Sequence, residues 1–180
     1  MRSAELGPRG PRRRRSRLVD WLAGAGMLML LLLGAQQLEQ RWNAPDQVAG
    51  FGEAIDGDSL RVAGREIRLK GVDAPEIDQY CADRTGRNYA CGVVARSWLH
   101  ARLQRGAVIC RIEGRDRYGR LLGACTRGEE LLNAAIVREG RAVDYGDYPR
   151  EEQEARAAQR GLWSGRFTLP SEHRAMKSQG

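Results

Sequence analysis

The sequence predicts an α+β fold, in which a five-stranded β-barrel carries about three helices and follows a hydrophobic N-terminal segment. Short stretches of alternating polarity joined by tight turns occupy residues 48–72 and 107–126, and a helical repeat lies between them at residues 89–105. Two further helical segments follow. At 180 residues the chain is long enough for one well-packed domain with appendages, but not for two domains.

The first 38 residues have the composition of an export signal. Residues 1–17 form a basic leader that includes four consecutive arginines, and an apolar run over residues 18–38 follows it. Because basic residues stay on the cytoplasmic side, we expect the rest of the chain to be exported. The run is long for a signal-peptide core, short for a transmembrane helix, and lacks a clear cleavage site. We therefore expect a signal anchor in the inner membrane with the domain on the periplasmic or extracytoplasmic side. The alternative is a cleaved signal peptide and a secreted protein.

A linker and a three-stranded meander come next. Residues 39–47 are polar and contain Pro45, so they predict a linker to a domain at residues 48–165. The first strand, residues 48–55, leads into Asp56-Gly57, a strong hairpin signal. Two more strands of alternating polarity follow, at residues 59–63 and 66–72. Three such strands need further strands to become stable.

A helix and a second hairpin follow the meander. Between residues 89 and 105 apolar side chains recur at helical spacing, and Gly106 ends that helix. Residues 107–112 and 121–126 predict two strands around a turn at residues 116–120.

The C-terminal part adds two short helices, at residues 131–138 and 149–160, and then a loosely held tail at residues 166–180. Five short strands with a helix between the third and the fourth is the arrangement of an OB-type barrel. The sequence therefore predicts this barrel as the body of the domain.

Four cysteines, an even number, predict two disulfide bonds in an exported chain: Cys81, Cys91, Cys110 and Cys125. Cys110 and Cys125 lie nearly symmetrically about the turn of the second hairpin, where residues face each other. This favours Cys110 with Cys125 and leaves Cys81 with Cys91. Two other connectivities stay open, as do four free thiols in a cytosolic protein. The absence of a Cys-x-x-Cys pair and the low count of two histidines argue against a structural zinc site.

The net charge of +7 suggests an anionic partner, but its distribution limits that inference. Seven arginines and two acidic residues lie before residue 36, so that segment carries a net +5 and the rest of the chain only +2. A function in nucleic-acid chemistry must therefore rest on locally placed arginines rather than on the isoelectric point.

Three separated segments carry the residue types that phosphodiester cleavage needs. They are Asp-Gly-Asp-Ser at residues 56–59, Ile-Arg-Leu-Lys-Gly-Val-Asp-Ala-Pro-Glu at 67–76, and Asp-Arg-Tyr-Gly-Arg at 116–120. Together they supply carboxylates for a hard divalent cation, a further carboxylate, and arginines. Each segment alone has an ordinary structural explanation as a turn or a solvated loop. Their combination at the ends of predicted strands favours one site at the edge of the barrel.

These segments and their order resemble the staphylococcal nuclease (thermonuclease) family, over about residues 48–163. In that family an Asp-Gly-Asp-Thr turn, an Arg-Leu-x-x-x-Asp-x-Pro-Glu segment and an Asp-Lys-Tyr-Gly-Arg turn surround one calcium ion. The resemblance implies that Asp58, Asp73 and the backbone carbonyl of Ala74 bind Ca²⁺ directly, and that Asp56 acts through water.

The resemblance also implies the catalytic roles. Glu76 would orient or deprotonate the attacking water, and Arg68 and Arg120 would grip the scissile phosphate and stabilise the charge it gains. Serine at position 59 and alanine at position 74 replace two threonines of the family pattern, and neither change removes a catalytic group.

The same resemblance assigns substrate contacts to Arg117, Tyr118 and Tyr145, with Tyr148 as a second candidate for the role of Tyr145. For both Tyr118 and Tyr145, a packing role is an equal alternative. Cys81 and Cys91 fall where the family carries a flexible, lysine-rich substrate loop, so we expect a more rigid loop here.

The favoured function is a calcium-dependent nuclease that acts on DNA, RNA or both, with low sequence specificity and 3′-phosphorylated products. We expect a monomer without an obligatory protein partner. The alternative is a non-catalytic OB-fold module that binds nucleic acid or protein. Asp58, Asp73 and Glu76 favour the enzyme, because without a metal they would repel a phosphate.

Overall fold

The computed structural model describes residues 21–22, 26–35 and 46–179. The chain divides into two compact units, Met1–Ala44 and Pro45–Gly180. In the first unit residues 26–35 are helical and exposed. Within the described ranges, no helix is both long enough and apolar enough to cross a membrane. The predicted leader lies outside the described residues, and so do parts of the predicted anchor and linker.

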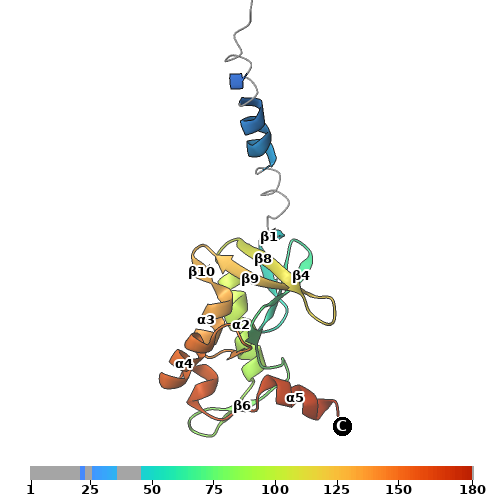
Figure 1. The fold of residues 1–180 in the computed structure, drawn as a ribbon. Coiled ribbons are helices and arrows are strands. Elements are labelled where there is room, and N and C mark those ends of the chain that lie inside the picture. The colour runs from blue at the N-terminus through green and yellow to red at the C-terminus, as the bar shows by residue number, and fades with distance from the viewer. Residues whose placement is uncertain (1–20, 23–25, 36–45, 180) are drawn as a thin grey trace, which may run out of the picture. The chain divides into compact units, whose positions relative to one another are not determined.

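The second unit is built around one mixed sheet with the strand order β1-β8-β9-β4-β3-β2, to which β10 is added beside β9 (Figure 1). The strands are β1 (Gln47–Gly50), β2 (Gly52–Ala54), β3 (Ser59–Val62), β4 (Arg65–Leu69), β8 (Val108–Arg115), β9 (Leu121–Arg127) and β10 (Glu130–Leu131). All pairs are antiparallel except β4 with β9, which is parallel.

The sheet closes on itself because its two end strands are consecutive in the chain. The predicted single strand at residues 48–55 is in fact two strands separated by Phe51, and β1 pairs with β8 while β2 pairs with β3. Gly50, with φ +155°, adopts a backbone conformation that other residues rarely reach, and this lets the chain change neighbours. Counting β1 and β2 as one bent strand, the ring has five strands, which confirms the predicted α+β fold and its OB-type barrel.

The three predicted helices are present as α2 (Cys91–Leu103), α3 (Leu132–Arg138) and α4 (Pro149–Ala157). A short 3₁₀ helix, η1 (Gly161–Ser164), follows α4. Two small two-stranded sheets complete the unit: β5 (Val72–Asp73) with β11 (Val143–Asp144), and β6 (Cys81–Ala82) with β7 (Asn88–Tyr89).

The tail predicted at residues 166–180 contains a helix, α5 (Pro170–Lys177), of which Pro170 alone is buried. Pro170 stands in the first turn, where its missing N–H costs no helical hydrogen bond. The Glu172 carboxylate accepts a hydrogen bond from the Leu169 N–H, which caps the same end.

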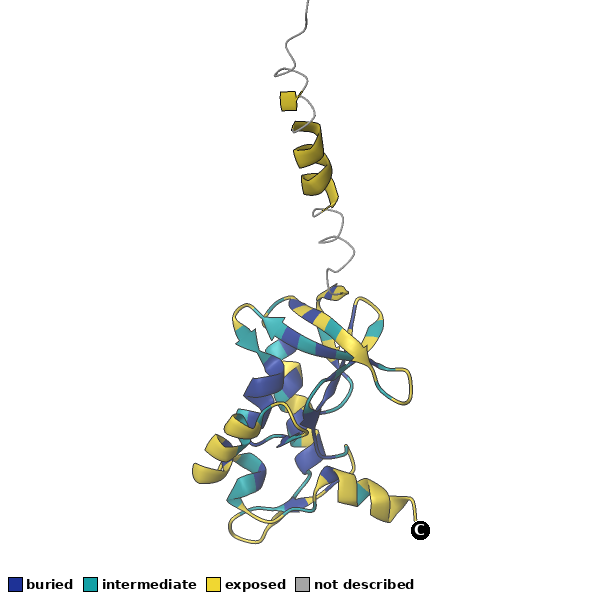
Figure 2. Ribbon diagram, viewed as in Figure 1, coloured by how far each residue is buried: buried dark blue, intermediate teal, exposed yellow. Residues whose placement is uncertain are grey.

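The core lies between the barrel and the helices that cover it (Figure 2). Leu60 and Ile67 from the barrel, Leu99 from α2 and Ile136 from α3 are fully buried. Asn133 of α3 is also fully buried, and it accepts a hydrogen bond from the Cys125 N–H and donates to two backbone carbonyls. It thereby fixes α3 on the strands that carry the site.

Both favoured disulfide pairings are present. Cys110 and Cys125 face each other in the β8–β9 register with their Cα atoms 4.0 Å apart. Cys81 and Cys91, with Cα atoms 5.6 Å apart, tie β6 to the first residue of α2. A second, smaller apolar cluster surrounds this second disulfide.

Candidate active site

Two carboxylates from separate segments converge at one end of the barrel. Asp58 ends the turn between β2 and β3, where its N–H donates to Asp56 Oδ1 at 2.9 Å. Asp73 ends β5, and both Asp58 and Asp73 are buried. The Ala74 N–H donates to Asp58 Oδ2 at 2.9 Å, so the backbone beside Asp73 is joined to the Asp58 turn.

Arg68 holds the two carboxylates together. It lies on β4 opposite Ser59 of β3. Its Nη1 is 2.6 Å from Asp58 Oδ1, and its Nη2 is 3.0 Å from Asp73 Oδ1. Two buried like charges need such a partner, because neither carboxylate is solvated by bulk water. The strand register therefore brings together three residues that the sequence predicted for one site.

The protonation of Asp58 reflects its burial. Burial raises the pKa of Asp58 to about 7; Arg68 opposes this shift, and the charge of Asp56 adds to it. A divalent cation next to this carboxylate would favour its ionised form.

Glu76 lies just beyond this pair, in the loop after Pro75, and Arg174 of α5 connects it to Asp73. Arg174 Nη1 is 2.8 Å from Glu76 Oε1 and 2.9 Å from Asp73 Oδ1, and its Nη2 is 3.1 Å from Asp73 Oδ2. These bonds, led by that to Asp73, raise the pKa of the Arg174 guanidinium. The sequence analysis missed Arg174, since no motif marks it and its partners lie about a hundred residues earlier in the chain.

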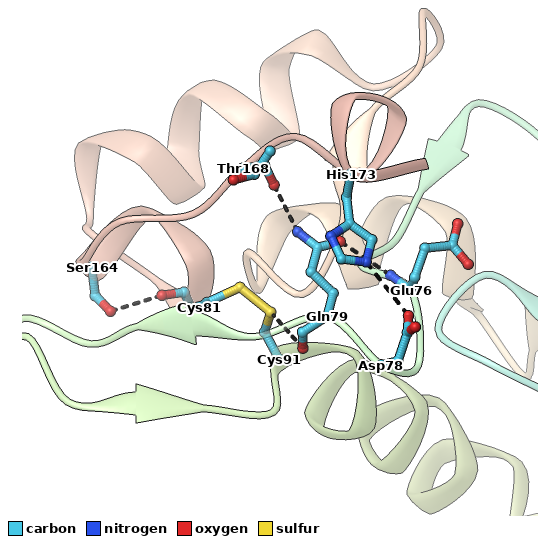
Figure 3. Close-up of a disulfide and its surroundings, with 9 residues drawn as sticks. Glu76, Asp78, Gln79, Cys81, Cys91, Ser164, Thr168 and His173 are labelled. Carbon is cyan, nitrogen blue, oxygen red and sulfur yellow. Dashed lines mark hydrogen bonds and ion pairs between the residues drawn. A yellow bond between two sulfur atoms is a disulfide. The ribbon is translucent and has the colours of Figure 1, made fainter. Parts of the chain in front are cut away.

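Gln79 fixes the loop that carries Glu76, and Figure 3 shows its side chain between Glu76 and Thr168. The buried Gln79 side chain accepts a hydrogen bond from the Glu76 N–H at 3.2 Å and donates to the Thr168 carbonyl at 2.7 Å. Cys91 Sγ lies 3.4 Å from the Gln79 carbonyl, so the Cys81–Cys91 disulfide supports the same loop. The expectation of a stiffened loop agrees with these contacts.

A glycine allows this loop to lie against the start of α2. A Cβ atom at Gly92 would overlap the backbone carbonyl of Glu76. Any other residue at position 92 would therefore push the loop, and Glu76 with it, away from the helix.

Arg120 feels the charge of Asp58, but its side chain is hydrogen-bonded to Asp116 of its own turn. Its Nε is 2.7 Å from Asp116 Oδ2. Burial lowers the pKa of Arg120, but the bond to Asp116 and the charges of Asp58 and Glu66 outweigh it and leave the pKa raised. Tyr118 is exposed, with the Arg117 guanidinium 4.8 Å and the Arg120 guanidinium 5.7 Å from its ring. The structure therefore gathers the third segment around Tyr118 and not directly on Asp58 and Asp73.

The two tyrosines beyond β11 differ in environment. Tyr145 is 73% exposed, and its N–H donates to the Gly71 carbonyl just before β5. Tyr148 packs against the core, and burial, with Asp147 and other acidic neighbours, raises its pKa to about 12. Tyr145 is thus accessible to a ligand, whereas Tyr148 packs against the core.

The donor set fits a hard cation with few protein ligands. Among the described residues, no three or more acidic, histidine or cysteine side chains gather closely enough to hold a metal. Asp58 and Asp73 nevertheless converge, and carboxylate oxygens, a backbone carbonyl and water together are ligands that Ca²⁺ accepts. The chemistry of the residues therefore fits the ion that the sequence predicted, with two carboxylates rather than a full cage.

Two hollows of the described domain lie away from these carboxylates. One is lined by residues of α2, β10 and α3, including Arg102 and Glu130, and another by residues including Lys70 and Tyr148. Neither is lined by Asp58, Asp73 or Glu76. A long polyanion does not need an enclosed pocket, so a site outside these hollows suits such a ligand.

The chain is similar in sequence to several known proteins. The sequence profile of the family described as "Staphylococcal nuclease homologue" matches residues 66–165, more than half of the chain. The chain is 35% identical over 139 residues to the "Succinoglycan biosynthesis protein ExoI" of Rhizobium meliloti, covering 73% of each chain. It is 32% identical over 127 residues to an "Uncharacterized endonuclease" of Escherichia coli, covering 64% of this chain and 76% of that one.

A fungal protein is similar over a smaller share of its length. The "Probable endonuclease LCL3" of Schizophyllum commune is 29% identical over 137 residues, covering 63% of this chain but only 46% of the fungal one.

Proposed function

The chain belongs to the family of staphylococcal nuclease homologues, and we propose from this premise that it is a nuclease hydrolysing phosphodiester bonds of DNA, RNA or both. The observation that carries the proposal is the convergence of two separate segments: Arg68 bonds both Asp58 of the first segment and Asp73 of its own, with Glu76 three residues beyond Asp73. Relatives named as endonucleases support the same activity. Low sequence specificity is part of the proposal, because the arginines address the phosphate rather than a base edge.

We propose that the cofactor is Ca²⁺, held by Asp58, Asp73 and the carbonyl of Ala74, with Asp56 reaching it through water. The bound ion would act as a Lewis acid and a template at the scissile phosphate. The convergence of the two carboxylates beside the Ala74 backbone supports this assignment, because carboxylate and carbonyl oxygens are the ligands that Ca²⁺ prefers.

The protein's own groups would perform the remaining work. Glu76, at the edge of the site, would accept the proton of the attacking water. Arg68 uses two of its five N–H donors on the carboxylates, which leaves donors for a phosphate oxygen. Arg120 would turn from Asp116 toward the phosphate, and Arg117, Tyr118 and Tyr145 would contact the nucleotides beside it. Cleavage that leaves the phosphate on the 3′ end is part of the proposal.

The proposed place of action is outside the cytoplasm, with the N-terminal segment as membrane anchor or export signal and the domain acting as a monomer. Two disulfides support an oxidising compartment, because cytosolic thiols are kept reduced. The basic leader supports an orientation with residues 1–17 in the cytoplasm.

The test is cleavage of plasmid and of single-stranded DNA and RNA by the full chain, in Ca²⁺, in Mg²⁺ and in chelator. We expect cleavage in Ca²⁺, none in chelator, and products whose 3′ ends a polymerase extends only after phosphatase treatment. Asp73→Asn should abolish cleavage. Glu53→Gln, the same kind of change at an exposed position of β2, should not. A folded parent protein that binds nucleic acid but never cuts it would identify a binding module instead.

A further inference from the structure

The C-terminal helix α5 places the Arg174 guanidinium against Asp73 and Glu76, which the proposed function assigns to metal binding and to catalysis. We propose that α5 is an inhibitory clamp, in which the Arg174 guanidinium competes with the divalent cation for Asp73 and masks Glu76. This inference rests on the proposed function, because it concerns access to the same site.

The contacts of Arg174 fall on the atoms that the cation would need. Both oxygens of Asp73 accept a hydrogen bond from it, at 2.9 and 3.1 Å, and Asp73 Oδ1 also accepts one from Arg68. A dication on Asp73 would lie within a few ångströms of a fixed positive charge, where like charges repel strongly in a partly desolvated site. Docked Arg174 therefore lowers the affinity of the site for the cation.

The same guanidinium covers one oxygen of Glu76. Arg174 Nη1 is 2.8 Å from Glu76 Oε1, so this oxygen is already bonded where an attacking water would have to donate its proton. The docked helix thus opposes both the binding of the metal and the chemistry.

Helix α5 is held in a way that allows release. Pro170 is its one buried residue, and most of the helix is exposed in Figure 2. Lys177 Nζ forms an exposed ion pair with the Asp78 carboxylate at 2.5 Å, and His173 Nε2 lies 3.5 Å from the same carboxylate. Exposed ion pairs contribute little stability each and weaken with salt, so docking is reversible.

A fixed point lies immediately before the helix. The Thr168 carbonyl accepts a hydrogen bond from Gln79, whose side chain is buried beside the Cys81–Cys91 disulfide. The chain at Thr168 is therefore anchored (Figure 3). In the proposed clamp, α5 moves about Leu169 while this anchor keeps the loop that carries Glu76 in place.

The decisive experiment measures calcium binding by calorimetry on the full chain without nucleic acid. We expect Arg174→Gln to bind Ca²⁺ more tightly than the parent, on the order of tenfold. Deletion of residues 170–180 should also tighten Ca²⁺ binding, because it removes Arg174 together with the whole of α5. Arg150→Gln, which removes an equal charge from the exposed start of α4, should bind like the parent.

Hydrogen exchange provides a second readout that does not depend on activity. In the parent protein, Ca²⁺ should speed the exchange of the α5 amides; in Arg174→Gln they should exchange fast with or without Ca²⁺. Equal or weaker Ca²⁺ binding by Arg174→Gln would overturn the clamp and leave the proposed function intact. That result would indicate that Arg174 binds the phosphate of the substrate instead of opposing the metal. Absence of Ca²⁺ binding in the parent and every variant would remove the calcium assignment and the clamp together.

Discussion

At the scale of single residues, the site depends on arginines that differ in their partners. Arg68 bridges Asp58 and Asp73, whereas Arg120 is paired within its own turn and Arg117 lies over the ring of Tyr118. A planar guanidinium presents donors to two carboxylates in a fixed geometry, which the freely rotating ammonium of a lysine does not. Arg68 therefore organises the carboxylates, and Arg120 is the arginine available to follow the charge on a phosphate.

This difference predicts unequal effects of two neighbouring substitutions. Arg120→Gln should slow DNA cleavage by roughly 10³-fold or more, because it removes a fixed charge that stabilises the transition state. Arg117→Gln, in the same turn, should slow cleavage by less than about tenfold, since an exposed cation contributes mainly to substrate binding. The measurement is the single-turnover cleavage rate of a labelled oligonucleotide at saturating Ca²⁺. Equal losses in the two variants would refute the separate role of Arg120.

The residues of the site were predictable to different degrees. Asp58, Arg68 and Asp73 lie in segments with recognisable motifs, and alternating strands joined by tight turns bring such segments to one edge. Arg174 was not predictable, because its contacts cross about a hundred residues and follow from where the tail packs. The pairing of Arg120 with Asp116 also needs the structure, since a sequence does not reveal the direction of a side chain.

At the scale of elements, the closing of the barrel was the least visible feature. Residues 48–55 have the alternation of one strand, yet the chain changes neighbours at Phe51. Alternation reports which face a residue occupies but not which strand it pairs with. The hairpin that carries Cys110 and Cys125 was predictable because its symmetry about the turn fixes the register.

An ion-pair group joins helix α2 to the β9–β10 corner and predicts a pH effect. Glu130 Oε2 is 2.6 Å from Arg127 Nη2, and Glu130 Oε1 is 3.3 Å from Arg102 Nε. Burial alone would raise the pKa of Glu130, but the two arginines outweigh it and leave the pKa below its ordinary value of 4.5. Because the folded protein binds this proton less tightly than the unfolded chain, the stabilisation is complete above pH 4.5. It is lost as the pH falls through the lowered pKa.

Glu130→Gln should therefore lower the free energy of unfolding by roughly 1 kcal/mol at pH 7, and by much less at pH 3. Urea unfolding of parent and variant at the two pH values measures this difference. Glu129→Gln, at the exposed neighbouring position, provides the control. If Glu130→Gln lowered the free energy of unfolding equally at both pH values, the charge of Glu130 would not be the source of its stabilising effect.

At the scale of the whole molecule, the distribution of charge separates two roles. The N-terminal segment carries most of the net positive charge, and the folded unit is nearly balanced. A balanced domain is a poor passive binder of a polyanion. A small group of arginines around carboxylates is better suited to brief contact and turnover, which agrees with a nuclease rather than a storage or packaging protein.

Glu76→Gln tests the central claim, that this domain cuts phosphodiester bonds with a general base at the edge of a calcium site. The measurement is the cleavage rate of a labelled DNA oligonucleotide by the full chain at saturating Ca²⁺, with Glu53→Gln as the control. The prediction is a fall of about 10³-fold or more in Glu76→Gln with DNA binding retained, because the change removes the group that accepts the proton of water. Cleavage at the parent rate by Glu76→Gln would contradict the assignment.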